Sequence, residues 1–210
     1  MEFTIRIASE DDIKYSNEIT YLYKLSAEER GIGIALRQPA YIEKKIKAEH
    51  AIIAMHDDEL AGFCYVETFS SGEYVSNSGL IVKAKYRGQG LAKKIKKSAV
   101  QIARNKFPSA KLFGITTSDV VLRINSELGY KPVTFNKLTT DSEFWNGCSS
   151  CRNYDILQRN EKKMCLCTAM LAPSKIEKKK AKEAKKAAKK SIKQAVKKAF
   201  KEAKKNKIHE

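Results

Sequence analysis

A glycine-rich segment, Arg87-Gly88-Gln89-Gly90, lies between an apolar run that ends at Val82 and a helical pattern that begins at Leu91. Backbone N–H groups at a helix start attract anions, and glycine lets the backbone approach a phosphate with no Cβ in the way. The segment lacks the Gly-Lys-Ser/Thr ending of a P-loop, and Lys93 stands where a dinucleotide fingerprint needs its third glycine. These departures exclude both of those loops. The glycine pattern by itself leaves open another phosphate-binding loop or a glycine turn that binds no ligand.

A second group of residues that could carry out chemistry consists of four of the five cysteines, in the pairs Cys148-Ser-Ser-Cys151 and Cys165-Leu-Cys167. Two close pairs of thiolates can hold a tetrahedral Zn²⁺, and Cys-x-x-Cys is the common spacing. If residues 164–171 form a strand, Cys165 and Cys167 share one of its faces and point toward the same ion. These four cysteines are candidate zinc ligands, with metal-free packing and thiol redox chemistry as alternatives.

Two carboxylates are candidates for proton transfer. Glu73 begins the apolar run that leads to the glycine segment, and Glu67 lies on the run before it. A carboxylate held near a reacting group can act as a general base. The alternative is that both are ordinary solvent-facing side chains.

The elements that must position these residues follow from the period of the apolar side chains. Alternation and short apolar runs bounded by turn residues predict strands, whereas steps of three and four predict helices. The order indicates a mixed α/β fold, a sheet with helices packed on it. Strands are expected over 3–7, 51–55, 60–69, 73–82, 111–115, 132–135 and 164–171, and helices after Ser9 and over 40–48, 91–105 and 118–128.

Two motifs together resemble the GNAT superfamily of N-acetyltransferases. The residues Val82-x-x-x-Tyr86-Arg87-Gly88-Gln89-Gly90-Leu91-Ala92 resemble its acyl-CoA pyrophosphate loop, with Lys85 as a positively charged departure at the first position. The stretch from Asn125 to Tyr130, which ends in Leu-Gly-Tyr, resembles the end of the fourth helix of that superfamily. The resemblance covers about residues 1 to 135 and implies the GNAT fold, with a mostly antiparallel sheet flanked by helices.

The resemblance also implies the chemistry: an amine attacks the thioester carbonyl of a bound acetyl-CoA or related acyl-CoA. Backbone groups of residues 80–82 would pair with the pantetheine arm, and residues 87–92 would cradle the pyrophosphate. The superfamily usually places a tyrosine acid where this chain has Asn125, which can hydrogen-bond the pantetheine or the thiolate but is not carried over as an acid. The attacking amine must lose a proton, and Glu73, at the start of the expected strand 73–82, is the candidate catalytic base that the resemblance implies. The expected acyl-CoA-binding residues are Leu80, Ile81, Val82, Arg87, Gly88, Gln89, Gly90, Leu91, Ala92 and Asn125.

The segment from Gly147 to Thr168 is also similar to a bacterial GNAT subgroup linked to N-acylation of an amino acid in arginine biosynthesis. The expected function is therefore transfer of an acyl group to a primary amine, a small molecule such as an amino acid. The alternative is a non-catalytic module that binds CoA or nucleic acid and acts through a basic tail.

That tail carries most of the excess charge of the chain. The net charge is +17, and residues 174–210 contain 16 lysines and 4 glutamates, which leaves only +5 for the rest. Apolar residues recur there at steps of three and four, mostly as alanine, which predicts a long amphipathic helix. A solvated helix, contact with nucleic acid or another polyanion, and binding to an anionic membrane are the open interpretations.

Three parts are therefore expected: an acyl-CoA-binding core over 1–135, a cysteine-rich segment over 136–173 that completes it, and the helical tail over 174–210. The sequence has no apolar run of the roughly 18–20 residues that a membrane span needs. Its start lacks the plan of a signal peptide, so the cytoplasm is the expected compartment. The oligomeric state does not follow from the sequence.

Overall fold

The computed structural model describes residues 1–31 and 34–206, with side chains up to residue 196. The strands form a sheet in the order β1-β2-β3-β4-β5-β7-β6, and all neighbours are antiparallel except β4 and β5. This confirms the predicted mixed α/β fold with a mostly antiparallel sheet. The strands are β1 (Thr4–Ile7), β2 (Ala51–His56), β3 (Glu59–Phe69), β4 (Tyr74–Val82), β5 (Lys111–Thr116), β6 (Lys131–Pro132) and β7 (Thr168–Ala172).

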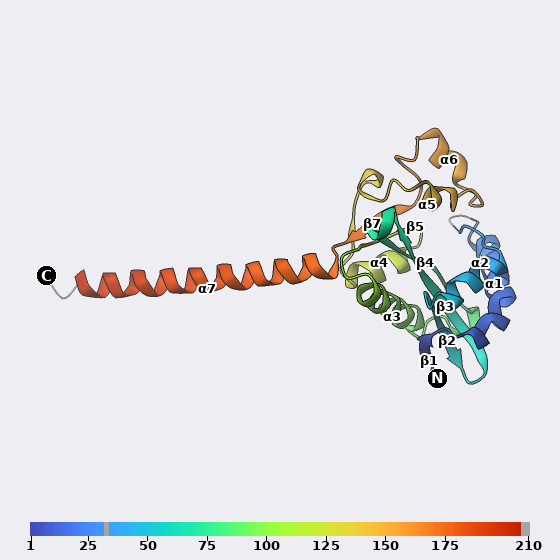
Figure 1. Ribbon diagram of the computed structural model, residues 1–210, viewed down its shortest axis with the longest axis horizontal. Coiled ribbons are helices and arrows are strands. Elements are labelled where there is room, and N and C mark those ends of the chain that lie inside the picture. Colours follow the sequence, from blue (N-terminus) through green and yellow to red (C-terminus); the bar gives the residue numbers. More distant parts are fainter. Residues whose placement is uncertain (32–33, 207–210) are drawn as a thin grey trace. The chain divides into compact units, whose positions relative to one another are not determined.

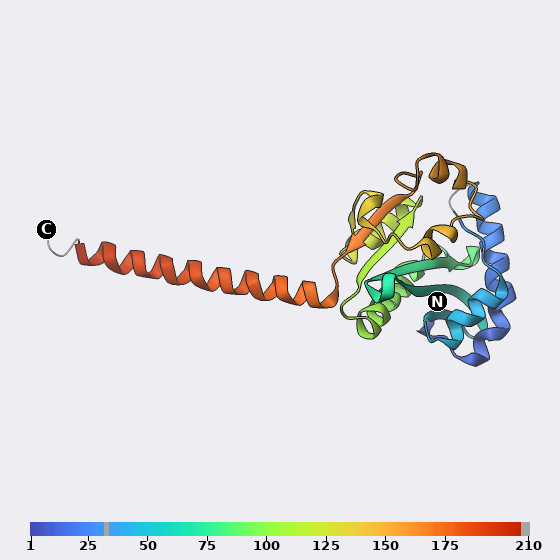
Figure 2. The same ribbon diagram turned by 45° about the horizontal axis from the view of Figure 1, so that its top comes forward.

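Helices cover both faces of this sheet, with α1 and α2 on one face and α3 and α4 on the other (Figures 1 and 2). The helices are α1 (Ser16–Arg30), α2 (Pro39–Lys47), α3 (Leu91–Lys106), α4 (Asp119–Glu127), α5 (Ser142–Asn146), α6 (Tyr154–Arg159) and α7 (Lys175–Asn206). Short 3-10 helices span Glu10–Tyr15, Ser70–Gly72, Ala84–Tyr86 and Phe135–Lys137. The helix predicted after Ser9 therefore starts as a 3-10 turn.

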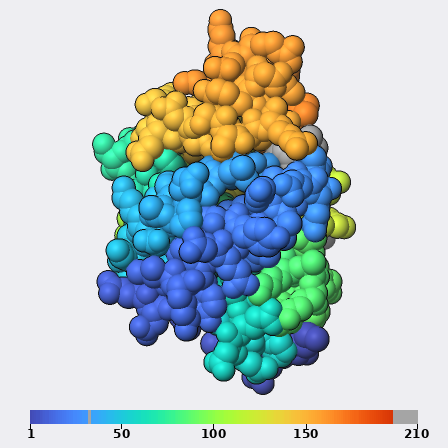
Figure 3. Space-filling model, turned by 90° about the vertical axis from the view of Figure 1, so that its right-hand side faces the viewer, coloured from blue at the N-terminus to red at the C-terminus, as the bar shows by residue number. Residues whose placement is uncertain are grey.

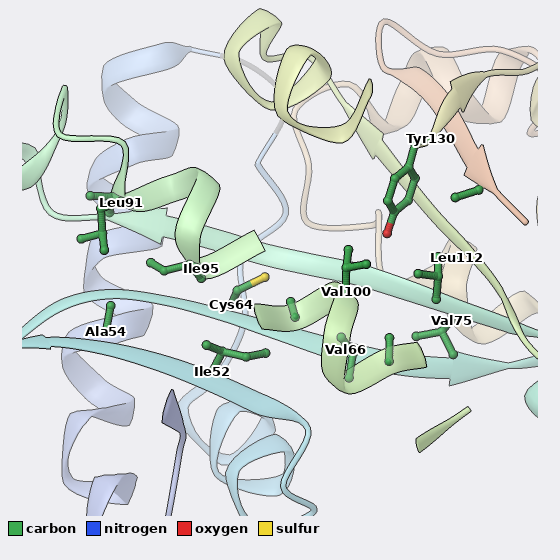
Figure 4. Close-up of a cluster of buried hydrophobic side chains, with 14 of the residues drawn as sticks. Ile52, Ala54, Cys64, Val66, Val75, Leu91, Ile95, Val100, Leu112 and Tyr130 are labelled. Carbon is green, nitrogen blue, oxygen red and sulfur yellow. The ribbon is translucent and has the colours of Figure 1, made fainter. Parts of the chain in front are cut away.

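The central strands are apolar on both faces because each face is covered by helices. On β2, Ile52 and Ala54 pack toward α3, whereas Ile53 and Met55 pack toward α1 and α2. Figure 4 shows the cluster on the α3 side, where Leu91, Ile95 and Val100 of the helix lie over the strands. The apolar steps that predicted α3 are thus the residues that attach it to the sheet.

The parallel neighbours β4 and β5 pair only at their beginnings. Their register runs from Tyr74 opposite Lys111 to Ser76 opposite Phe113, and from Asn77 onward β4 has no partner in β5. The strands therefore form a V-shaped opening in the middle of the sheet, which we call the V.

A bulge lies in β4 within the V. The register with β3 shifts between Phe63 and Tyr65, and Gly79 adopts a positive φ of 64°. A Cβ at Gly79 would lie 2.3 Å from the Tyr65 ring, so a side chain there would displace that ring. Tyr23 of α1 donates a hydrogen bond of 2.6 Å to the Gly79 carbonyl oxygen, which ties the bulge to the helix layer.

The segment between β6 and β7 builds a cluster of its own around aromatic side chains. Trp145 is 4% exposed, stacks on Phe135, and donates a hydrogen bond of 2.9 Å to the Thr139 carbonyl oxygen. The last strand begins at Thr168, so the prediction of a strand from residue 164 was wrong: residues 164–167 precede the pairing with β5.

The chain divides into two compact units, Met1–Ser174 and Lys175–Glu210. Helix α7 occupies the second unit, and its side chains from residue 175 to residue 196 are exposed. The predicted continuation of its apolar stripe, Ala199, Phe200 and Ala203, lies outside the residues whose side chains are described. Within the described ranges, none of the helices has the length and apolar character to cross a membrane.

Candidate functional site

The glycine-rich loop joins the end of β4 to the start of α3, as predicted. Gly88 and Gly90 adopt positive φ values of 80° and 73°, and Gly90 is the N-cap of α3. A Cβ at either glycine would meet nothing within 4 Å, so the space over the loop is open. The N–H groups of the first helical turn have no acceptor within the helix. The loop thus presents free donors at the positive end of a helix dipole, which is the arrangement that binds phosphate.

The charged side chains of the loop are held by protein partners. The Arg87 guanidinium donates to the Val82 carbonyl oxygen at 3.2 Å and lies 3.1 Å from a Glu29 carboxylate oxygen. Lys85 forms an ion pair with Glu59. Leu91 is buried in the core, so only its backbone can serve an anion. Anion binding at this loop therefore depends chiefly on backbone N–H groups, with Gln89 exposed beside them.

A cavity of about 190 Å³ lies at the V. Residues on both arms line it, and so do three of the predicted acyl-CoA residues: Leu80 and Ile81 of β4, and Asn125 of α4. From Asn77 onward, the backbone of β4 has no partner in β5, so an extended ligand could pair with it as an added strand does.

Asn125 of α4 offers an unused acceptor to this cavity. Its side chain is 2% exposed, and its Nδ2 donates to the Met170 sulfur at 3.6 Å. Its Oδ1 is buried without a hydrogen-bond partner. A buried orphan acceptor is unfavourable in a folded protein, and a ligand donor in the cavity would satisfy it.

Arg37 points into the cavity from the opposite side of the sheet. Its Nε donates to the Tyr65 hydroxyl at 3.2 Å, and its Nη1 donates to the Gly147 carbonyl oxygen at 3.0 Å. The second contact joins the α1–α2 layer to the segment between β6 and β7, which lie against each other in Figure 3. Across the described part of the chain, no carboxylate forms an ion pair with Arg37, so its positive charge faces the cavity uncompensated.

The four clustered cysteines also line this cavity. Burial raises the pKa of the Cys148 thiol to about 11, and burial together with the neighbouring thiols raises the pKa of Cys167 further. All four are free thiols. No group of three or more His, Cys, Asp and Glu side chains in the described ranges is arranged to hold a metal ion. The structure therefore brings Cys148, Cys151, Cys165 and Cys167 to one wall but does not support the predicted zinc site.

The structure does not bring Glu73 to the cavity. Glu73 precedes β4 at the end opposite the glycine loop and lines a separate hollow with Ser71 and Lys111. The alternative carboxylate, Glu67, forms an ion pair with Lys45 and accepts a hydrogen bond from Tyr41. Glu73 is therefore separated from the V, because β4 runs away from that end toward the V.

Arg37 and Lys96 are two of the cavity residues that were not found from the sequence. Arg37 lies in the connection before α2, where no periodic pattern marks it. Lys96 carried a usable signal: it lies four positions before Val100 and next to Ile95, on the apolar face of the helix. A lysine on a face that must be buried is a reason to look for a special role.

Residues 19–119 match the acetyltransferase (GNAT) family. This range contains the glycine loop, both arms of the V, and Arg37 and Lys96. None of the curated proteins compared with the chain matches it.

Three solved structures are similar in fold. N-acetylglutamate synthase from Neisseria gonorrhoeae, complexed with coenzyme A and N-acetyl-glutamate, is 20% identical over 83% of this chain, with a TM-score of 0.60. This chain spans about a third of the length of that synthase, since the match covers 35% of it. A Mycobacterium tuberculosis protein in complex with CoA is 15% identical over 81% of this chain and 98% of its own, with a TM-score of 0.58. The Salmonella typhimurium protein yncA, with acetyl-CoA, is 13% identical over 82% of this chain and 94% of its own, with a TM-score of 0.55.

Proposed function

Because the chain belongs to the GNAT family of acetyltransferases, we propose that it transfers the acetyl group of acetyl-CoA to the amine of a small molecule, a free amino acid. The observation that carries the proposal is the cavity at the V. One end of β4 leads from it to an anion-binding loop, and a guanidinium faces it from the opposite side of the sheet. These features suit a cofactor with phosphates and an acceptor with a carboxylate.

In the proposed complex the pyrophosphate lies on the N–H groups at the start of α3. The pantetheine arm then extends along Val82, Ile81 and Leu80, whose backbone has no partner in β5. The amide groups of pantetheine can form hydrogen bonds with this backbone and with the orphan oxygen of Asn125. This path places the thioester inside the V.

The amine then attacks the thioester carbonyl, and an oxyanion develops on the carbonyl oxygen. Backbone N–H groups near the bulge at Gly79 are suited to stabilise that oxyanion because they are fixed before the reaction. Among the described residues, no Asp, Glu or His lines the cavity. The proton of the attacking amine is therefore proposed to leave through water rather than to a carboxylate base.

Arg37 supports an amino acid as the acceptor. A guanidinium matches a carboxylate with two parallel hydrogen bonds, and a partly buried one gains most from such a partner. One of the similar structures holds a ligand with such a carboxylate: the N. gonorrhoeae synthase is complexed with N-acetyl-glutamate and coenzyme A. The M. tuberculosis protein also holds CoA.

The test measures CoA release with matched pairs of amines and the full chain. L-glutamate is compared with 4-aminobutanoate, and L-alanine with ethylamine, so that each pair differs by the α-carboxylate. Release with the amino acid of a pair and not with its partner is the expected result. If acetyl-CoA binds but both amines of a pair give equal CoA release, recognition of the α-carboxylate is refuted. If acetyl-CoA shows no saturable binding, the proposed activity itself is refuted.

We propose a second activity for α7: electrostatic binding of polyanions such as nucleic acid. Its side chains from residue 175 to residue 196 are exposed and rich in lysine, and its apolar stripe is mostly alanine. Many exposed cations on one helix favour contact with phosphates without base recognition. The expected signature is affinity that depends on salt and not on sequence.

A further inference from the structure

Lys96 is a buried lysine at the cavity. Its side chain belongs to α3 and is 3% exposed. Its Nζ donates to the backbone oxygen and to the Oδ1 of Asn77, each at 3.0 Å. Among the described residues no carboxylate forms an ion pair with it. Burial of an unpaired ammonium is unfavourable, so the position calls for an explanation.

The place of Lys96 in the fold is specific. Asn77 is the first residue of β4 beyond the pairing with β5, so Lys96 lies at the point where the V opens. Asn125, with its orphan Oδ1, lines the same cavity from α4. Both helices cover one face of the sheet, and α3 is the helix whose start faces the glycine loop (Figure 1). Arg37 reaches the cavity from the other face, on the side proposed for the acceptor.

A purely structural role does not account for the charge. The carbonyl oxygen of Asn77 needs a donor because β5 has diverged, but a neutral amide or a water molecule would supply one. A neutral donor at this position would avoid the desolvation cost of a buried, unpaired charge. A charge kept at the inner end of a reaction cavity is therefore better explained by the reaction.

We infer that Lys96 is the acid that protonates the sulfur of CoA as the thiolate leaves, an inference that rests on the proposed acetyl transfer. In this step the bond between the amine nitrogen and the carbonyl carbon has formed, and the carbon–sulfur bond breaks with its electron pair on sulfur. One proton passes from the Lys96 ammonium to that sulfur. The proton released by the attacking amine passes through water and restores the ammonium, so that amide and CoA thiol are the products.

The electrostatic setting supports this role. Burial lowers the pKa of Lys96 toward that of a thiol, and proton transfer is most efficient between groups of similar pKa. The titratable groups around it are Cys64 of β3, whose thiol donates to Asn77 Oδ1 at 3.0 Å, and Tyr130, which follows α4. Burial raises the pKa of Cys64 to about 11 and raises that of Tyr130 as well, so neither competes as an acid near neutral pH.

The decisive experiment follows ionisation of the CoA thiol in the complex and needs no acceptor. The ultraviolet absorbance of thiolate is titrated with pH for the full chain bound to CoA, with the complex of desulfo-CoA as the blank, in about 200 mM salt to suppress binding to α7. We expect the wild type to lower the pKa of bound CoA by at least about one unit relative to free CoA, a tenfold larger thiolate fraction. Lys96→Met should remove the shift.

Three controls keep the result interpretable. Lys97→Met changes an exposed lysine next to it on α3 and should leave the shift intact. Desulfo-CoA should bind the wild type and Lys96→Met equally, which shows that the site is folded. Lys96→Arg should retain the shift, since it keeps the charge, yet slow turnover because arginine does not release its proton.

Kinetics with any accepted amino acid give a second readout. Lys96→Met should lower kcat by about 10²- to 10⁴-fold with little change in KM for acetyl-CoA. The decline of wild-type kcat as the pH rises through the pKa of Lys96 should be absent from the variant. A thiolate fraction in the Lys96→Met complex within twofold of wild type overturns the inference while leaving the proposed function standing. Absence of CoA binding by the wild type overturns both.

Discussion

Lysines in the compact unit and lysines in α7 occupy two different electrostatic settings. In the compact unit, Lys45 pairs with Glu67, Lys83 pairs with Glu18 and Glu59, and Lys96 is held by Asn77. In α7, lysine recurs along an exposed helix with few acidic residues between. A lysine with a fixed partner at a defined depth can contribute to one chemical step. A repeated, exposed lysine contributes to charge density, which selects for polyanions as a class.

The largest effect that would test this contrast is the salt dependence of α7. The full chain should lose about 10³-fold in affinity for double-stranded DNA between 50 and 200 mM salt, because each phosphate contact releases counterions. A chain that ends at Ser174 should lose most of this binding and bind acetyl-CoA as before. Fluorescence anisotropy measures the first and calorimetry the second. Equal DNA binding by the shortened chain would contradict the assignment of polyanion binding to α7.

In the compact unit, the largest expected effect comes from the glycine loop. Gly90→Glu places a carboxylate at the phosphate site and forces a side chain onto a φ of 73°, so acetyl-CoA affinity should fall about 100-fold or more. Gly72→Glu is the matched control, because Gly72 also has a positive φ and open space but lies in the β3–β4 turn. Calorimetric titration of acetyl-CoA into both variants measures the two affinities. A similar affinity loss in both would point to general destabilisation rather than to the loop.

A smaller effect is expected on the acceptor side. Arg37→Met should raise KM for an amino acid acceptor about tenfold or more, equivalent to about 1.4 kcal/mol, through loss of the bond to its carboxylate. The acetyl-CoA dissociation constant should stay within about twofold. Arg30→Met offers a comparison, since Arg30 lines the same cavity but is exposed and held by Thr117. If KM rises equally for the amine of each pair that lacks the α-carboxylate, Arg37 acts on the shape of the site and not on that carboxylate.

The smallest effect concerns the cysteine wall. The folded pKa of Cys148 is raised from 9.0 to about 11, so above pH 9 the unfolded chain releases a proton that the folded chain keeps. The stability contributed by this thiol is fully present below pH 9 and is lost as the pH rises through 11. Under reducing conditions, Tm should fall by roughly 2–4 °C between pH 8.5 and 10.5, and by less in Cys148→Ala. An identical fall in the variant would assign the pH dependence to other groups.

The part of the site that depends on local structure could be predicted from the sequence. A glycine loop between a strand and a helix is determined by neighbours in the chain, so its residues could be named and their element placed correctly. The V could not be derived, because it depends on where β4 and β5 stop pairing, which periodicity does not record. The distance between Glu73 and the V could not be derived for the same reason: its strand was predicted, but not which end of the strand faces the cavity.

Residues that come to the cavity from distant parts of the sequence show most clearly what could not be predicted. Arg37 is positioned by Tyr65 and by Gly147, and the latter is 110 positions away in the chain. Lys96 could have been suspected from its place on an apolar helix face, but its partner, Asn77, depends on the sheet. The cysteine pairs lie on one wall as their spacing suggested, yet the second pair precedes β7 instead of lying on it.

The wall that carries the cysteines begins and ends at neighbouring strands. Lys131 of β6 pairs with Leu171 of β7, so the chain leaves the sheet and returns to it at adjacent positions. We expect an insertion or deletion between them to change the proposed acceptor side of the cavity and to leave the strand register, the glycine loop and Lys96 where they are. A change of length or sequence in this one segment would therefore alter which acceptor fits, and it would leave the residues proposed to bind the acyl donor in place.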